Sequence, residues 1–469
     1  MNLFELTNGL PLMPLRGHDP FLVPKDITGV TADPAKVGPG VLFVATRTPL
    51  LSGRNWVHTA YRKGCRAFLT THDPALPPDA AVLLTGEPKK MLSFLAARFY
   101  GFPSAGMRIF GVCGTLGKTT AILMAEQILL QNGVRAGIMT PQLSRFEKCL
   151  ISGGDVPADG AETQHVLGLL RDAGCETVLM ECGSYPFLHH AFDAVAFDGV
   201  AKIRYDFDDV EPGVFRTEEE CRRVFTRFPP VGVPVLYRFG KGKEMIADNM
   251  IPATENGRPG RRFTVHTCAG ERTVFLPVPG DFAVEDAMAA AAICRAAGLP
   301  EEDIFRVFPT LSPAGTLELL EARDGGMVFR DSAYRPRDLA RALLALRSLT
   351  AGRLKVLFGS VGERAFFRRV PLSEAAGYAD FVYLTADDPG SENPENICKE
   401  LAAALPRGTE YLIVPDRARA IRRALADLCP GDVLLLAGKG LGSTQRVMGQ
   451  KIPFDEREQV AAAGGQLIW

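Results

Sequence analysis

The chain has 469 residues, 46% of them hydrophobic and 23% charged, which excludes a largely disordered chain, and at roughly 150 residues per domain predicts about three domains. The 53 Lys and Arg residues nearly cancel the 54 Asp and Glu residues, and the net charge of −1 excludes the basic footprint of a nucleic-acid-binding protein. No apolar run reaches the roughly 20 residues that span a bilayer, and no charged segment followed by an apolar one opens the chain, so we expect a cytosolic (cytoplasmic) protein without a membrane span.

The first segment alternates short apolar runs with helical patterns, as a small α/β domain does. Strands are expected at 27–30, 41–44, 67–69 and 82–84, and helices at 55–62 and 91–100. A turn-rich string, Gly101-Phe102-Pro103-Ser104-Ala105-Gly106, then ends the pattern. We therefore place a domain boundary near residue 105.

The rest of the chain divides near residue 312, at a second turn. Before it we expect strands at 107–112 and 177–180 and a helix at 282–297. After it the rhythm becomes regular, with strands at 354–358, 381–385, 411–414 and 433–436 and helices at 336–349, 394–405 and 417–428. Such βαβ units predict a parallel sheet.

A glycine-rich loop joins the strand at 107–112 to a helix and has the residues that a phosphate-binding loop needs. Glycines turn successive backbone N–H groups toward one anion, and the helix N-terminus adds partial positive charge. A lysine can reach the β- and γ-phosphates, and a threonine hydroxyl can ligate Mg²⁺. The alternative is a glycine turn that only starts a helix. The predicted nucleotide-binding residues are Gly114, Thr115, Gly117, Lys118, Thr119 and Thr120.

The segment from Gly111 to Thr120 resembles the loop of the Mur ligases, usually written TGTNGKTT, with Cys113 for the first Thr and Leu116 for the Asn. The resemblance extends over nearly the whole chain and is nearest to the UDP-N-acetylmuramoyl-tripeptide synthetases. It implies an ATP-dependent amide-forming enzyme of peptidoglycan synthesis that uses ATP and Mg²⁺. The implied substrates are a UDP-N-acetylmuramoyl-peptide-like molecule and an amino acid, and we expect a monomer.

The fold that the resemblance implies is α/β with three domains. These are a small N-terminal α/β domain that binds the UDP substrate (1–105), a central P-loop ATPase-type domain (106–312) and a C-terminal Rossmann-like domain (313–469). In the first, Thr31-Ala32-Asp33 resembles the uridine-nucleotide-binding segment and makes Asp33 a substrate-binding candidate. The Ser-Arg that usually follows this aspartate is Pro34-Ala35 here, so the sequence leaves recognition of UDP open.

The resemblance places the magnesium and catalytic residues in the central domain. Glu181 follows the strand at 177–180, at the edge where an open α/β sheet binds ligands, and matches the family's magnesium glutamate. The family's Asp-His-Leu-Asp falls on Asp208-Asp209-Val210-Glu211. Thr119, Glu181 and Asp209 are thus the implied metal ligands, and Lys118, Glu181, Asp208 and Asp209 the implied catalytic residues. An acidic surface loop is the alternative for 205–209.

One departure concerns the second metal site. The family completes that site with a carbamylated lysine, and counting along the helix places the position on Phe225. Phenylalanine cannot ligate a cation, and Arg222, Arg223 and Arg227 nearby are permanent cations that repel Mg²⁺. Either an arginine replaces the second metal electrostatically at the acyl phosphate, or the chemistry is impaired.

The C-terminal domain keeps the family's framework and lacks its amino-acid specificity residues. Arg364 and Lys439 match family motifs. Where an Asp-Asn-Pro-Arg motif is usual, Gly390 replaces the arginine that pairs with a meso-diaminopimelate carboxylate, and Leu441 replaces a histidine. The resemblance therefore makes meso-diaminopimelate an improbable amine. Asp387, Asp388 and Glu392 could face a cationic amino acid instead, or form an acidic loop without a ligand.

Three functions stay open at this point. In the first, a substrate carboxylate attacks the γ-phosphate of ATP, and an amine then displaces phosphate from the acyl phosphate. In the second, the chain binds nucleotide without ligating and serves as a partner or regulator in cell-wall synthesis. In the third, an amide ligase of this type acts on a substrate outside peptidoglycan. Retention of Lys118 and Glu181 favours a ligase.

Overall fold

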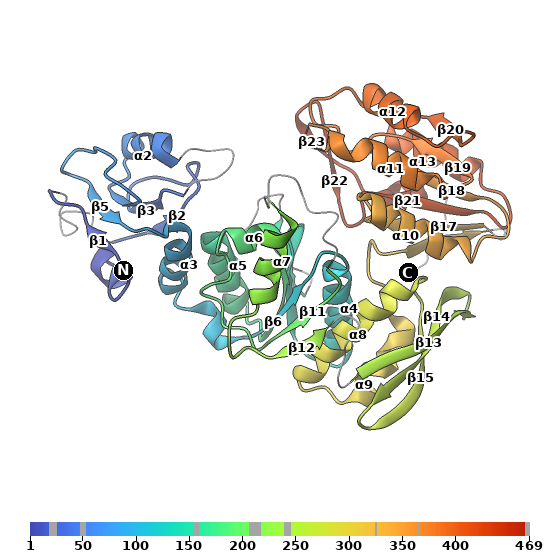
Figure 1. The fold of residues 1–469 in the computed structure, drawn as a ribbon, viewed down its shortest axis with the longest axis horizontal. Helices are drawn as coiled ribbons and strands as arrows, with labels where there is room; N and C mark the ends of the chain where they lie inside the picture. The colour runs from blue at the N-terminus through green and yellow to red at the C-terminus, as the bar shows by residue number, and fades with distance from the viewer. Residues whose placement is uncertain are drawn as a thin grey trace. The chain divides into compact units, whose positions relative to one another are not determined.

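The computed structural model describes residues 1–17, 26–46, 53–147, 149–153, 159–205, 217–238, 245–323, 326–363 and 365–464 (Figure 1). These residues form two compact units. The first comprises Met1–Phe239 with Ala292–Leu299, and the second comprises Gly240–Ala291 with Pro300–Trp469. Each is built on largely parallel sheets, so the predicted α/β class is confirmed.

The first unit begins with a five-stranded sheet in the order β1-β5-β4-β3-β2. Its strands are parallel except for the edge strand β1, which pairs antiparallel with β5. The elements of this part are α1 (Leu3–Thr7), β1 (Met13–Pro14), β2 (Gly29–Thr31), β3 (Val41–Val44), α2 (Gly53–Arg62), β4 (Ala67–Thr70), β5 (Ala81–Leu84), α3 (Pro88–Phe99) and η2 (Pro103–Gly106).

A seven-stranded sheet in the order β12-β11-β6-β10-β7-β8-β9 follows in the same unit. Strands β12 through β7 are parallel, and β8 and β9 extend the sheet as antiparallel strands. The elements are β6 (Arg108–Cys113), α4 (Lys118–Gln131), β7 (Ala136–Met139), β8 (Leu143–Phe146), β9 (Cys149–Gly153), α5 (Gly160–Asp172), β10 (Thr177–Cys182), α6 (Ser184–Leu188), β11 (Gly199–Lys202), α7 (Glu218–Arg227) and β12 (Val235–Arg238).

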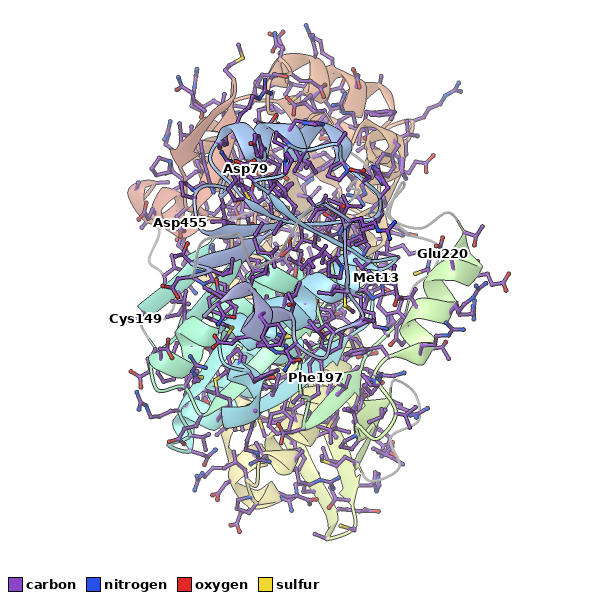
Figure 2. All side chains as sticks on the ribbon, turned by 90° about the vertical axis from the view of Figure 1, so that its left-hand side faces the viewer. Met13, Asp79, Cys149, Phe197, Glu220 and Asp455 are labelled. Atoms are coloured by element: carbon purple, nitrogen blue, oxygen red, sulfur yellow. The ribbon has the colours of Figure 1, made fainter. Side chains whose placement is uncertain are left out.

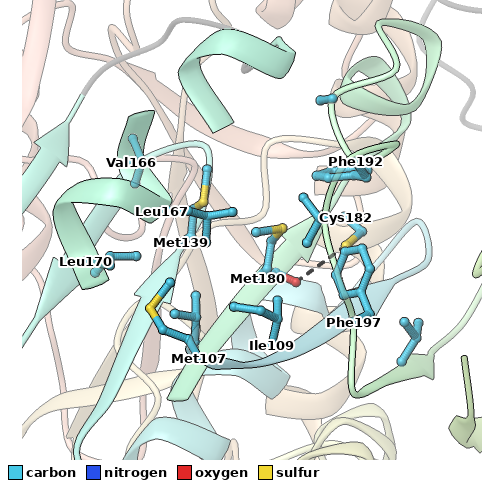
Figure 3. Close-up of a cluster of buried hydrophobic side chains, with 14 of the residues drawn as sticks. Met107, Ile109, Met139, Val166, Leu167, Leu170, Met180, Cys182, Phe192 and Phe197 are labelled. Carbon is cyan, nitrogen blue, oxygen red and sulfur yellow. Dashed lines mark hydrogen bonds between the residues drawn. The ribbon is translucent and has the colours of Figure 1, made fainter. Parts of the chain in front are cut away.

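A buried apolar cluster holds the central strands of this sheet in place (Figure 3). Ile109 of β6 and Met180 of β10 lie within it together with Leu167 of α5, and all three are almost fully buried. Because successive side chains of a strand point to opposite faces, the residues at the other face of β6 and β10 pack against α4. Both central strands are therefore covered on two sides, and their carboxyl ends are fixed relative to each other.

The second unit contains a three-stranded antiparallel sheet and a six-stranded sheet in the order β16-β17-β21-β18-β19-β20. The six strands are parallel except for the edge strand β16. The elements are β13 (Met245–Glu255), β14 (Arg258–Thr267), β15 (Gly270–Leu276), α8 (Asp281–Ala296), α9 (Glu301–Val307), η3 (Phe308–Thr310), β16 (Glu318–Arg323), β17 (Gly326–Asp331), α10 (Pro336–Arg347), β18 (Leu354–Phe358), η4 (Phe366–Arg368), α11 (Arg369–Ala376), β19 (Phe381–Leu384), α12 (Pro394–Ala403), β20 (Glu410–Ile413), α13 (Arg417–Ala426), β21 (Val433–Ala437), β22 (Thr444–Val447), β23 (Gln450–Pro453) and α14 (Glu456–Ala462).

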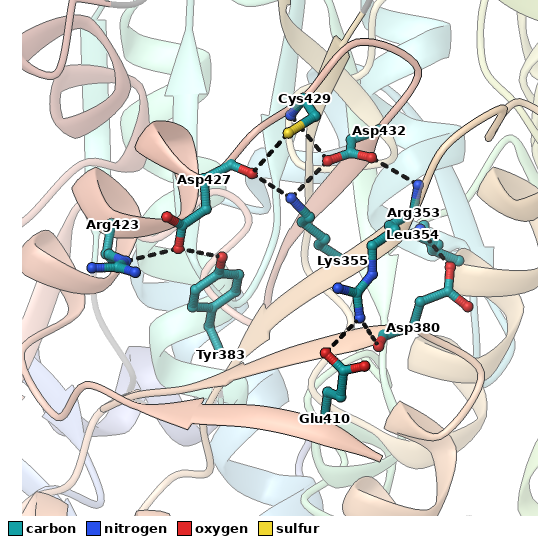
Figure 4. Close-up of polar contacts among 10 residues, drawn as sticks. All are labelled: Arg353, Leu354, Lys355, Asp380, Tyr383, Glu410, Arg423, Asp427, Cys429 and Asp432. Carbon is teal, nitrogen blue, oxygen red and sulfur yellow. Dashed lines mark hydrogen bonds and ion pairs between the residues drawn. The ribbon is translucent and has the colours of Figure 1, made fainter. Parts of the chain in front are cut away.

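Buried charges lock the amino ends of the six-stranded sheet (Figure 4). The Lys355 ammonium lies 2.6 Å from a carboxylate oxygen of Asp432, and both side chains are buried. Burial alone would raise the pKa of Asp432, but hydrogen bonds from Lys355 and from the backbone amides of Arg353 and Cys429 hold it below its ordinary value. The pair therefore ties the start of β18 to the start of β21, while the opposite edge is left to loops.

The predicted strands and helices of the parallel sheets are present, with ends shifted by a few residues. The sheet β13–β15 was not predicted, because its alternation of half-exposed polar residues carries no strong apolar signal. The boundaries near 105 and 312 stay predictions. In the described part of the chain, no helix is long and apolar enough to cross a membrane.

We expect Lys355→Met to lower the free energy of unfolding by about 3–5 kcal/mol, because it leaves a buried carboxylate without its cation. The pKa of Asp432 lies below its ordinary value of 3.8, so the stabilisation is present above that pH and is lost as the pH falls below it. Urea unfolding at about pH 7 and about pH 2.5 measures both effects. The control Lys399→Met removes an exposed ion pair with Glu395 and should cost less than about 0.5 kcal/mol. An equal loss in both variants would contradict the assignment.

Candidate functional site

The loop after β6 is shaped for close approach of an anion to the backbone. It lies between Cys113, the last residue of β6, and Lys118, the first of α4. Gly114 has φ +150°, and a Cβ there would lie 2.6 Å from Cγ1 of Ile203. Gly117 precedes the helix in the left-handed region, with φ +86°. Both positions thus require glycine, and the α4 N–H groups face the loop without a side-chain cap.

Lys118, Thr119 and Glu181 meet at the carboxyl ends of β6 and β10. Parallel pairing sets Glu181 opposite Val112, just before the loop. The Thr119 hydroxyl donates a 2.6 Å hydrogen bond to Oε2 of Glu181, and the Lys118 ammonium lies 3.6 Å from Oε1. The Lys118 and Glu181 side chains are 14% and 8% exposed, so solvent screens the ion pair weakly. The structure thus brings Glu181, which is more than 60 residues away in the sequence, to the adjacent pair Lys118 and Thr119.

This donor set suits a magnesium ion held beside a phosphate group. Mg²⁺ takes hard oxygen ligands and is commonly held by one or two carboxylates, a hydroxyl and substrate phosphates. Thr119 and Glu181 offer a hydroxyl and a carboxylate within hydrogen-bonding distance of each other. No cluster of three or more His, Cys, Asp or Glu side chains suited to a metal occurs among the described residues. The remaining ligands would therefore have to come from the nucleotide and water.

The other predicted residues of the central domain are placed as follows. Thr120 is buried in the first turn of α4, and the Thr115 amide donates a 2.8 Å hydrogen bond to the carbonyl of Arg204. Asp208 and Asp209 lie outside the described residues, as does Arg364 of the C-terminal segment.

Phe225 is a core residue of α7. Its side chain is 3% exposed and packs edge-on against Tyr205 and Phe187, with ring centroids 5.0 Å and 5.6 Å away. The other face of α7 is polar, and Glu220 in its first turn is labelled in Figure 2. Phe225 thus offers no side-chain ligand to a metal.

The arginines of α7 do not turn inward beside Phe225. Arg222 donates to Glu218, and Arg223 lies 3.7 Å from Glu219, with both arginine side chains more than half exposed. Arg227 is exposed. The helix directs these cations to its outer face, so its geometry gives no support to an arginine in place of the second metal.

The structure adds one residue that sequence reasoning missed. Lys202 ends β11, the strand next to β6, and its ammonium donates a 3.3 Å hydrogen bond to the carbonyl of Phe225. The sequence carries no signal for this role, because the strand β11 was not predicted and the position of the lysine depends on the pairing of β11 with β6.

Asp33 closes a turn after β2. Its carboxylate accepts a 2.8 Å hydrogen bond from the amide of Ala35, and its own amide donates to the hydroxyl of Thr31 at 2.9 Å. These contacts account for an aspartate here as a turn residue. Its predicted contact with substrate stays a prediction.

The predicted residues at the carboxyl edge of the six-stranded sheet are held by cations of their own unit. The Lys439 ammonium lies 3.4 Å from Asp387 and 2.5 Å from Asp388, whose side chain is 42% exposed. Arg369 donates to Glu392 at 2.7 Å. Gly390 has φ +65°, and a Cβ there would lie 2.8 Å from Cδ of Glu363. Glycine at 390 is thus demanded by its surroundings, and Asp388 presents the more exposed carboxylate.

Comparison with known proteins agrees with a nucleotide-dependent α/β enzyme fold. The family model described as Mur ligase, glutamate ligase domain, matches residues 316–440. A UDP-N-acetylmuramoyl-L-alanyl-D-glutamate–2,6-diaminopimelate ligase of Chlorobaculum tepidum is 31% identical over 94% of this chain and 93% of its own. The corresponding ligase of Caldanaerobacter subterraneus is 29% identical over 93% and 94%. The chain therefore belongs to the Mur ligase family.

Solved structures support the fold. A UDP-N-acetylmuramoyl-L-alanyl-D-glutamate–2,6-diaminopimelate ligase covers 93% of this chain and 94% of its own, with a TM-score of 0.62 and 21% identity. A MurF ligase of Thermotoga maritima in complex with ADP covers 93% and 97%, with a TM-score of 0.58 and 16% identity. At these identities the likeness establishes the shared architecture alone.

Gly114→Ala should abolish the stabilisation of the protein by an ATP analogue, because the added Cβ collides with Ile203 and the carbonyl of Arg204. The forced change of backbone should also cost about 1–3 kcal/mol of stability. Thermal unfolding with and without the analogue measures both. Gly106→Ala, before the same strand, is the control because a Cβ there meets open space. Retained analogue binding by Gly114→Ala would show that the loop does not hold phosphate.

Proposed function

We propose that the chain is an ATP-dependent acid–amino acid ligase of the Mur type. In this proposal it joins an amino acid to the carboxylate of a UDP-N-acetylmuramoyl-peptide-like substrate through an acyl phosphate. The observation that carries the proposal is the convergence of Lys118, Thr119 and Glu181 on the glycine loop after β6. The activity of the relatives, which are ligases that match this chain over nearly its full length, supports it.

In this proposal, different residues of the loop contact different parts of the bound triphosphate. The backbone amides after Gly114 and the N-terminus of α4 would receive the phosphate oxygens, and Lys118 would contact the β- and γ-phosphates. Thr119 and Glu181 would hold Mg²⁺, which supplies charge neutralisation for phosphoryl transfer when bound. Asp208 and Asp209 stay proposed helpers on the strength of the resemblance. Preorganised cations and N–H groups then provide most of the stabilisation of the transferred group.

The amine substrate differs in this proposal from that of the diaminopimelate ligases. Gly390 has no side chain and lies at φ +65°, and Leu441 is apolar, so two polar contacts to a second carboxylate are missing. Asp388 is partly exposed beside Lys439 and could face a cationic group of another amino acid. Asp33, Arg364, Asp387, Glu392 and Lys439 remain the other proposed substrate-binding residues.

The remaining features of the proposal follow from its substrates. Nucleotide-linked precursors and ATP are cytoplasmic, so we infer a cytoplasmic enzyme, acting as a monomer. The division into three domains at residues 105 and 312 is part of the same proposal.

A non-ligating homologue that binds nucleotide as a partner or regulator in cell-wall synthesis is the second candidate. The observation that favours it is Phe225, which leaves a metal-ligand position of the resemblance without a ligand.

Release of ADP in the presence of UDP-N-acetylmuramoyl-L-alanyl-D-glutamate and a panel of amino acids separates the two candidates, with products identified by mass spectrometry. We expect turnover with at least one amino acid, and a loss of at least about 100-fold in Lys118→Ala, because the cation at the γ-phosphate is gone. Lys90→Ala, on the exposed face of α3, is the control and should retain activity. ATP binding without turnover for every amino acid would favour the non-ligating homologue.

A further inference from the structure

Lys202 differs from three other buried or half-buried lysines in having no carboxylate beside it among the residues that the structure describes. Lys118 pairs with Glu181, Lys355 with Asp432, and Lys439 with two aspartates. Lys202 is half-buried, and its ammonium donates to the Phe225 carbonyl at 3.3 Å. Among the residues that the structure describes, none supplies an acidic side chain to it.

A charged ammonium on Lys202 is energetically unfavourable in the protein without bound substrate. Burial lowers the pKa of Lys202, and the nearby positive charge of Arg238 lowers it further, whereas Cys113 has the opposite effect. A single neutral carbonyl compensates only part of the lost hydration of an ammonium. An anion that binds beside Lys202 in the substrate complex would offset this lost hydration energy.

The register of the sheet places this ammonium beside the phosphate loop. Lys202 lies opposite Cys113, which directly precedes Gly114. The Cys113 thiol, whose pKa burial raises to about 11, also responds to the positive charges of both Lys202 and Lys118. Two ammonium groups therefore approach the same strand end. One is neutralised by Glu181, and the other has no anion among the described residues.

The surroundings of Lys202 keep the ammonium at this strand end. The ring of Phe225 is fixed in the aromatic cluster with Phe187 and Tyr205, so its carbonyl is a fixed acceptor. Tyr205 in turn hydrogen-bonds the Cys113 thiol across 3.2 Å. The lysine is thus held by a rigid apolar wall on one side and faces the sheet edge where ligands of open α/β sheets bind.

We propose that Lys202 is a further catalytic residue, whose ammonium contacts the anionic group that is phosphorylated and then displaced in the ligase reaction. This inference rests on the proposed function. In the first step an oxygen of the acceptor carboxylate bonds to the γ-phosphorus while the bond from phosphorus to ADP breaks. In the second step the amine nitrogen bonds to the carbonyl carbon, the bond from carbon to the phosphate oxygen breaks, and the nitrogen gives up a proton to solvent.

Lys202 keeps its own proton in both steps and contributes charge alone. The negative charge that it meets passes from the carboxylate to the transferred phosphoryl group and then to the departing phosphate. Phe225 offers no side-chain ligand to a metal at this point, so a cation of the protein supplies the charge there. A preorganised cation of this kind stabilises the transition state more than the free reactants.

Orthovanadate, which takes the place of a transferred phosphoryl group, tests this role without an acceptor or an amine. We expect wild type, Lys202→Met, Lys202→Arg and the control Arg238→Met to bind MgADP with affinities within about threefold in calorimetric titration, because Lys118 and the loop are unchanged. With MgADP saturating, we expect Lys202→Met to bind orthovanadate about 100-fold more weakly than wild type. Lys202→Arg should recover at least about tenfold, and Arg238→Met should match wild type.

The outcomes separate the two proposals. Absence of MgADP binding by wild type would overturn the proposed function itself. Normal MgADP binding with equal orthovanadate affinity in wild type and Lys202→Met, or with no orthovanadate binding at all, would overturn the role of Lys202. Unchanged MgADP affinity is also the evidence that Lys202→Met is folded. Lys202→Gln, with a polar neutral head group, replaces it in the same comparison if the Met variant unfolds.

Discussion

The parallel pairing of β6 with β10 is the constraint on which the proposed site depends. The two strands pair without a bulge from Thr177 opposite Arg108 to Cys182 opposite Cys113, so they end at one level. The chain leaves one strand through the glycine loop, and the other strand carries Glu181 at that level. A shift of one residue along this register would turn Glu181 to the opposite face of the sheet. The buried cluster of Figure 3 opposes such a shift, because Ile109 and Met180 would have to leave it for the face of the sheet that packs against α4.

The second unit uses its six-stranded sheet in a similar way. Its amino edge is fixed by the buried pair of Lys355 and Asp432. At its carboxyl edge, the loops are connected by ion pairs of Lys439 with Asp387 and Asp388. Buried charges at one edge give a rigid base, and partly exposed charges at the other leave groups that a ligand can reach. The same division of a sheet into a structural and a ligand-binding edge holds for open α/β folds in general.

Those parts of the site that depend on local sequence could be predicted. The loop from Gly114 to Thr120 is contiguous in the sequence. Its glycines allow the backbone turn, its lysine can contact phosphate, and its threonines can ligate Mg²⁺. Glu181 could be predicted because a rule of parallel sheets places strand ends together. The cationic position of Lys202 could not be predicted, because it depends on the register of β11 against β6 and on the direction in which Phe225 faces.

Glycine at position 390 shows the same limit. The sequence indicates only that a side chain is missing there, whereas the structure shows the left-handed backbone, with φ +65°, that favours glycine. Likewise, the polar alternation of β13 and β14 resembles that of a solvated segment until the antiparallel pairing of the strands is known. Both cases depend on contacts between residues that are distant in the sequence, which local patterns do not record.

The central claim is that a phosphoryl group held by the loop after β6 passes to an oxygen of the acceptor carboxylate. Its most direct test is turnover with ATP, the accepted amino acid and an acceptor whose reacting carboxylate carries ¹⁸O at both oxygens, followed by ³¹P NMR of the released phosphate. We expect each phosphate released with amide product to contain one ¹⁸O atom from the carboxylate. Phosphate without ¹⁸O, released at the rate of amide formation, would contradict it.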